Sequence, residues 1–144
     1  MSRDERGSAL VEVIWLGILL LVPLVYVVLS VFEVQRGAFA VSAAARSAAR
    51  AYSLAGSDAA GRAAAELSVR TALADQGLRG QPFDLAITCT PDPGACLTPG
   101  STIRVVVATR VGLPFLPDSL GRNRPGFRLD ATQQVPYGTY RETR

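Results

Sequence analysis

The sequence predicts an α+β protein. We expect a long N-terminal helix, transmembrane at first and amphipathic beyond, followed by a second helix and a small three-stranded antiparallel sheet with one disulfide. Three observations lead to this expectation. Residues 13–32 carry no charge, residues 33–54 continue with a helical repeat, and after Gly80 the apolar residues alternate with a period of two.

The uncharged run is long enough to cross a bilayer. At about 1.5 Å per helical residue, residues 13–32 span roughly 30 Å, the thickness of the hydrocarbon core. We therefore expect the transmembrane part at residues 10–32 and an extracytoplasmic part of the same helix at residues 33–54. Pro23 lies in the middle of the run, where it removes a backbone hydrogen bond and can kink or loosen the helix.

The extension of the helix has a thin apolar face of small residues. At 100° per residue this face holds Val34, Ala38, Val41, Ala45, Ala48 and Tyr52, with Arg36, Arg46 and Arg50 on the opposite side. Small residues allow close approach of another element. That element is either the head of the same chain or the same helix of another copy.

A second helix is expected from Asp58 to about Gln76. Residues 55–58 break the first helix and offer an N-cap, and Gly77 is a stop signal. On this helix Arg62, Glu66 and Arg70 follow one another at i,i+4 spacing, which is typical of a solvated face.

Three later segments alternate as strands do. Their inward positions are Phe83, Leu85, Ile87 and Cys89, then Ile103, Val105, Val107 and Thr109, then Phe127, Leu129 and Ala131. We expect the first two strands to form a hairpin. Antiparallel pairing of all three would offer one apolar face to the helices.

The two cysteines, Cys89 and Cys96, flank a turn-rich loop over residues 90–95. An even pair in a chain with a membrane segment predicts a disulfide formed outside the cytoplasm. Free thiols and a metal or redox pair are the alternatives, although two thiolates fall short of the four ligands of structural zinc.

Composition argues against catalysis. The chain has no histidine, which removes the usual general base and the usual zinc ligand, so we expect no enzyme, no catalytic residue, no metal and no cofactor. The net charge of +3 comes with dispersed arginines, so nucleic-acid binding is not expected. Arg122, Arg124 and Arg128 lie close together in or beside a loop, which is either solvated or contacts an anion or a partner.

Charge and cysteines agree on topology. Residues 1–7 are hydrophilic and slightly positive, so they stay in the cytoplasm, and the oxidised head lies outside. Glu12 is an acid at the edge of the apolar run. Because an ionised carboxylate in a bilayer costs about 2.5 to 3.5 kcal/mol on insertion scales, it either has a partner or reaches back to water.

Residues 7–12, Gly-Ser-Ala-Leu-Val-Glu ahead of an apolar helix, resemble a type IV prepilin signal. In that family a membrane peptidase cuts after the glycine. The resemblance implies a leader at residues 1–7, cleavage between Gly7 and Ser8, and a mature chain in which Glu12 pairs with the new amino terminus. Classical pilins usually carry Phe or Met where Ser8 stands, so N-methylation of Ser8 is left open.

With its long helix at residues 8–54, its α+β head at residues 55–144 and its tail at residues 131–137, the chain resembles TadE-like minor pilins and pseudopilins of tight-adherence (Tad/Flp) pilus systems. The resemblance implies a structural subunit with three kinds of partner: the prepilin peptidase, other pilin subunits that pack through the N-terminal helix, and the pilus assembly platform. It also implies a single-pass membrane protein that becomes part of an extracellular pilus after processing.

Two other functions remain open at this point. The chain could be an uncleaved, membrane-anchored extracytoplasmic accessory or adhesin module of a secretion or pilus system. A Sec-type signal peptide cut after Ala40 is the other possibility, because residues 38–40 have the small-x-small form. The apolar run is longer than a usual signal-peptide core, however, and Glu33 and Arg36 separate it from that site.

Overall fold

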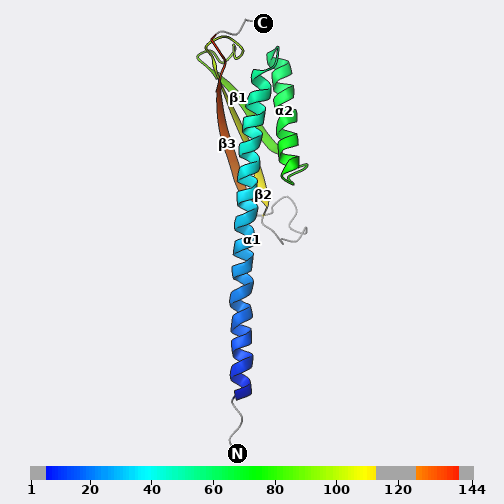
Figure 1. The fold of residues 1–144 in the computed structure, drawn as a ribbon, viewed down its shortest axis with the longest axis vertical. Helices are drawn as coiled ribbons and strands as arrows, with labels where there is room; N and C mark the ends of the chain where they lie inside the picture. The colour runs from blue at the N-terminus through cyan, green and yellow to red at the C-terminus, as the bar shows by residue number, and fades with distance from the viewer. Residues whose placement is uncertain (1–5, 113–125, 140–144) are drawn as a thin grey trace, which may run out of the picture.

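The computed structural model describes residues 6–112 and 126–139. In chain order it contains α1 (Arg6–Ser53), α2 (Asp58–Asp75), β1 (Phe83–Thr90), β2 (Thr102–Gly112) and β3 (Gly126–Pro136) (Figure 1). This confirms the α+β fold with a long apolar helix, a second helix and a three-stranded antiparallel sheet. Figure 1 shows that the first half of α1 stands alone and that its second half runs alongside α2 and the sheet. We call these parts the stem (residues 9–32) and the head.

α1 is one helix of 48 residues, and Pro23 lies inside it. It begins at Arg6, two residues before the expected start, and ends at Ser53. The helix continues on both sides of Pro23, so one continuous helix joins the stem to the head.

The face of α1 that enters the head is wider than the sequence indicated. Its buried residues are Gly37, Ala40, Val41, Ala44, Ala45, Ala48, Ala49 and Tyr52. Most are alanines, which allow α2 and the sheet to approach the helix closely. The prediction for Ala38 was wrong, because it is exposed. Ala38 lies on the same side of α1 as Ala45 but about 10 Å nearer the stem, where that side is no longer covered.

Both ends of α2 are capped as predicted. The Ser57 hydroxyl accepts a hydrogen bond from the backbone N–H of Ala60 at 3.3 Å, which satisfies one free donor of the first turn. At the other end Gly77 has a φ of 78°, and the N–H of Leu78 donates to the carbonyl of Leu73 at 2.9 Å. This six-to-one bond is the Schellman pattern, which needs a left-handed residue such as glycine.

The strands lie in the order β1-β2-β3, and both pairs are antiparallel. The inner face of β2, with Ile103, Val105 and Val107 fully buried, forms the centre of the core against α1. The predicted alternation of β1 and β2 is therefore confirmed. β3 differs at its start, where Phe127 was expected to face the core but is 49% exposed.

Gly37 sets the point at which the head begins. A Cβ at this position would lie 2.6 Å from Cγ2 of Val111 and 2.7 Å from Cδ1 of Leu129. The end of the β2–β3 pair therefore rests directly on the helix backbone. Since Gly37 follows Phe32 by five residues, this contact lies only about 8 Å beyond the uncharged run.

Candidate assembly stem and processing site

The stem exposes a continuous apolar surface. Its side chains from residue 9 to residue 29 are all exposed, and they include Leu10, Trp15 and Leu19 at 65%, 68% and 70% exposure. One helix in the described residues, α1, is long and apolar enough to cross a membrane, and none of its most apolar stretch is buried within the protein. Apolar area of this size needs a cover of lipid or of other helices.

Glu12 lies on the exposed stem, near its N-terminal end. Within residues 6–112 and 126–139, no group forms an ion pair or hydrogen bond with its carboxylate. Any partner must therefore come from outside this part of the chain, from another molecule, or from water.

The expected processing site lies in the first turns of α1. Gly7 and Ser8 are both helical, and residues 1–5 of the expected leader lie outside the described residues. Glu12 follows Ser8 by four residues, so their positions are one helical turn apart on the same side of α1.

The two cysteines form the expected disulfide. Cys89 and Cys96 are bonded, with their Cα atoms 5.2 Å apart. Cys89 is the last inward residue of β1, and Cys96, which belongs to the β1–β2 connection, is also buried. The bond therefore fastens the β1–β2 connection to the core at the end of the head far from the stem, as Figure 1 allows the reader to follow.

The arginine cluster is described only in part. Arg122 and Arg124 lie outside the described residues, whereas Arg128 lies on β3 and forms an ion pair with Asp84 of β1 at 3.7 Å. Both side chains are largely exposed, so this pair contributes little to stability.

A polar network at the turn between the helices was not predicted. The Tyr52 hydroxyl, at the end of α1, donates a hydrogen bond to Asp58 at the start of α2, and Arg62 binds the other carboxylate oxygen at 2.8 Å. Burial, reinforced by the bond to Asp58, raises the pKa of Tyr52 to about 12. The bonds from Tyr52 and Arg62 lower the pKa of Asp58. The N-cap signal at Ser57 placed Asp58, but nothing local indicated that Tyr52 would reach it.

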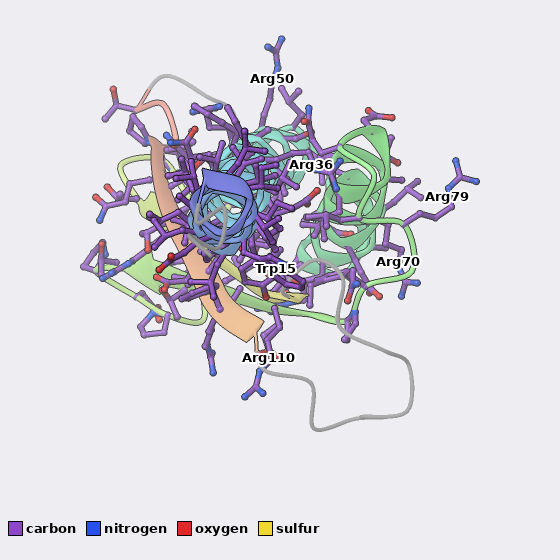
Figure 2. The ribbon with its side chains drawn as sticks, turned by 90° about the horizontal axis from the view of Figure 1, so that it is seen from below. Trp15, Arg36, Arg50, Arg70, Arg79 and Arg110 are labelled. Atoms are coloured by element: carbon purple, nitrogen blue, oxygen red, sulfur yellow. A yellow bond between two sulfur atoms is a disulfide. The ribbon has the colours of Figure 1, made fainter. Side chains whose placement is uncertain are left out.

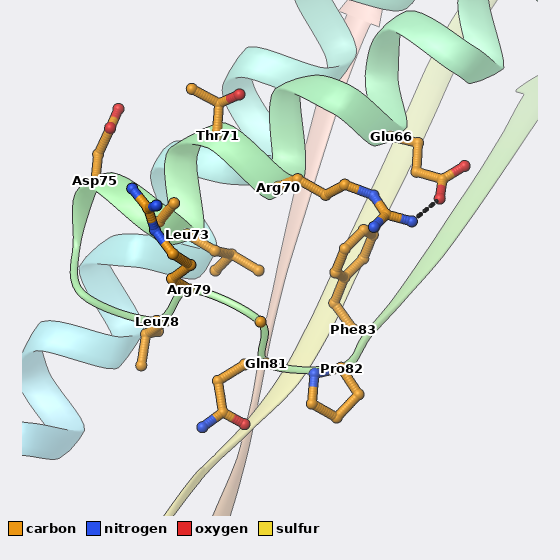
Figure 3. A pocket seen from close by; sticks show the side chains of 12 residues that line it. Glu66, Arg70, Thr71, Leu73, Asp75, Leu78, Arg79, Gln81, Pro82 and Phe83 are labelled. Atoms are coloured by element: carbon orange, nitrogen blue, oxygen red, sulfur yellow. Dashed lines mark hydrogen bonds and ion pairs between the residues drawn. The ribbon is translucent and has the colours of Figure 1, made fainter.

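An open cavity of about 700 Å³ lies between the end of α2 and the start of β1 (Figure 3). Arg70 crosses its wall, where it binds Glu66 at 2.6 Å and lies 5.7 Å from the centre of the Phe83 ring. The Arg70 guanidinium is thus held by the Glu66 carboxylate and by the Phe83 ring. These contacts also confirm the solvated i,i+4 face expected for Glu66 and Arg70.

A second hollow, of about 400 Å³, was also missed. It lies between the upper stem and the start of β3 and is lined by Tyr26, Val27, Ser30, Val31, Val34, Gln35 and Phe127. We call it the stem crease. No local pattern in the sequence indicates it, because the crease depends on how far β3 descends along α1.

No family model, curated protein or solved structure matches this chain.

Proposed function

We propose that this chain is a structural pilin-like subunit, a minor pilin or pseudopilin of a tight-adherence pilus. The stem holds it in the membrane until a prepilin peptidase cuts after Gly7, and the mature chain then joins the filament at its tip, at its base or along its length. The observation that carries the proposal is the division of one helix into an exposed apolar stem and a second half that packs into the core of the head.

This division suits a subunit that changes surroundings. An exposed apolar helix is stable both in lipid and among other apolar helices, since both keep it from water. A stem that ends in the core of its own head, with no linker between, can be transferred from one surrounding to the other without refolding the head.

Glu12 supports the same reading. A carboxylate on an apolar stem needs a partner, and no described group supplies one. Cleavage after Gly7 would create an ammonium group on Ser8, one turn away on the same chain or within reach on a neighbouring chain. Pairing of this ammonium with Glu12 would align subunits during assembly.

The proposal assigns no catalysis and no cofactor to the head. The chain has no histidine. Its role rests on surfaces instead, with the N-terminus in the cytoplasm and the head outside the membrane. The implied partners are the peptidase, other pilin subunits and the assembly platform.

Mass spectrometry of the mature N-terminus tests the proposal. Co-expression with the prepilin peptidase should yield a chain that begins at Ser8, and Gly7→Ala should keep the leader. Glu12→Ala should be cut but should fail to enter filaments, whereas Glu33→Ala, which removes an acid beyond the stem, should be cut and assembled. A native chain that keeps Met1 or Ser2 would contradict the proposal and indicate the uncleaved anchored accessory or adhesin module.

A further inference from the structure

The end of the head nearest the stem combines an apolar tip with a pair of arginines. Phe127, at the start of β3, lines the stem crease together with residues of α1 from Tyr26 to Gln35. The next residue, Arg128, is paired across the sheet with Arg110 of β2. Apolar and basic groups are thus adjacent along the strand.

The crease and the arginines follow one another along α1. The crease reaches down to Tyr26 and Val27, so its apolar lining on α1 lies beside the last part of the uncharged run, and Phe127 lines it from the sheet. Phe127 is paired with Val111, which meets α1 at Gly37, about 8 Å beyond Phe32, and the two arginines are the next pair along the strands. The headgroup layer of a bilayer is about 5 to 7 Å thick on each side of the hydrocarbon. If the uncharged run fills the hydrocarbon, the crease is open to acyl chains and the strand tip lies at the outer edge of the headgroup layer, from which long arginine side chains reach the phosphates.

The arginine pair has an unfavourable arrangement by itself. Arg110 and Arg128 are directly opposite on the outer face of the sheet, and like charges in this position repel. Asp84 compensates Arg128 only through a 3.7 Å exposed pair, and no described side chain pairs with Arg110. Figure 2, seen from the stem end, shows Arg110 pointing away from α1. An anion beside the pair would relieve the repulsion.

We propose that the stem-side tip of the β2–β3 pair docks on the membrane and binds anionic phospholipids. Acyl chains contact Phe127 and fill the stem crease, and headgroup phosphates contact Arg110 and Arg128. Long arginine side chains reach phosphates in this way while the apolar groups beside them stay in lipid. The inference rests on the membrane-resident stage of the proposed function but not on processing or assembly.

The depth of Phe127 is the first test, with the full-length Gly7→Ala chain, which keeps its leader, reconstituted in vesicles of phosphatidylcholine brominated on its acyl chains. Trp15 of this chain reports that the stem has inserted, because bromine quenches its fluorescence. In a Trp15→Phe background, tryptophan placed by Phe127→Trp should be quenched strongly. Tryptophan placed by Leu54→Trp, at the far end of the head, should not. An unquenched tryptophan at position 127 in an inserted chain would overturn the proposal.

The headgroup is the second test. In nanodiscs with equal amounts of phosphatidylcholine and phosphatidylglycerol, native mass spectrometry should find phosphatidylglycerol enriched on the released protein. Each arginine near an anionic surface strengthens binding to anionic lipid by about fivefold. Replacing both residues by Arg110→Gln and Arg128→Gln should lower the enrichment by about an order of magnitude or more. The matched double variant Arg46→Gln and Arg50→Gln removes equal charge from exposed positions farther along α1 and should retain the enrichment. Equal loss in both variants, or no loss in the first, would overturn the proposal.

A second copy of the helix is the competing occupant of the crease. It predicts that quenching of tryptophan at position 127 falls as the protein-to-lipid ratio rises and dimers form, and this result would also overturn lipid docking. Failure of the lipid tests would leave cleavage at Gly7 unaffected. Failure of cleavage would leave lipid docking unaffected, because the chain used is uncut.

Discussion

Replacing Gly61 by alanine should destabilise the head, although alanine is the better helix former. A Cβ at this position of α2 would lie 2.8 Å from Cδ2 and 3.1 Å from Cε2 of Tyr52. The ring cannot swing away, because Tyr52 is fully buried and its hydroxyl is bound to Asp58. Overpacking of this kind costs about 1 to 3 kcal/mol, whereas glycine to alanine in a helix gains about 1 kcal/mol. We expect a net loss of about 1 kcal/mol in the free energy of unfolding.

Thermal unfolding of the full chain in detergent micelles, followed by the near-ultraviolet circular dichroism of the tyrosines, measures this effect. For a head of this size the loss corresponds to a fall in Tm of roughly 4 °C. Gly56→Ala is the control, because a Cβ there meets no atom within 4 Å, and its Tm should stay close to that of the parent chain.

A higher Tm for Gly61→Ala would refute the reasoning. The double-mutant cycle gives a further check, since neighbouring residues are expected to couple. In a Tyr52→Leu background the ring is gone, and Gly61→Ala should then show the usual gain of helix propensity.

Four further outcomes follow from the structure. Replacing Cys89 and Cys96 by alanine should lower the free energy of unfolding by about 2 to 3 kcal/mol, as expected for so short a loop, and reductant should lower the Tm of the parent chain but not of the variant. The lowered pKa of Asp58 gives stability that is present above its ordinary value of 3.8 and lost as the pH falls through the lowered folded value, so Asp58→Asn should flatten the acid limb of a Tm–pH curve. The raised pKa of Tyr52, about 12 against 10.0, gives stability that is lost as the pH rises from 10 to 12, and Tyr52→Phe should remove this alkaline dependence. Gly37→Ala should loosen the contact between α1 and the sheet, which protease sensitivity of the β2–β3 end would detect.

Local patterns were enough to predict the elements. Alternation from Phe83 to Cys89 predicted a strand because side chains of a strand face opposite sides in turn. The hairpin followed from two such runs on either side of a turn-rich loop, and the disulfide from an even pair of cysteines in a chain with a membrane segment. Ser57 and Gly77 marked the ends of α2 because free backbone groups there need a cap and a left-handed residue.

Features that depend on distant segments were not predicted. Ala38 has the right phase on α1, but its exposure is decided by where α2 and the sheet stop. The bond between Tyr52 and Asp58 depends on the path of the turn that joins the helices. The position of Phe127 depends on strand register and on how far the sheet descends beside the stem, neither of which has a local signal. The stem, by contrast, needed only length and composition.

Because α1 passes from stem to head without a joint, the direction in which the head faces is fixed by helical phase. Each residue of an α-helix turns the chain by about 100°. One residue inserted between Phe32 and Gly37 would therefore rotate the head by about 100° and raise it by about 1.5 Å relative to the stem. In a bundle of stems of the natural chain, every head would face the same direction relative to its own stem. The number of residues between stem and head therefore sets the orientation of the heads in any assembly this chain enters.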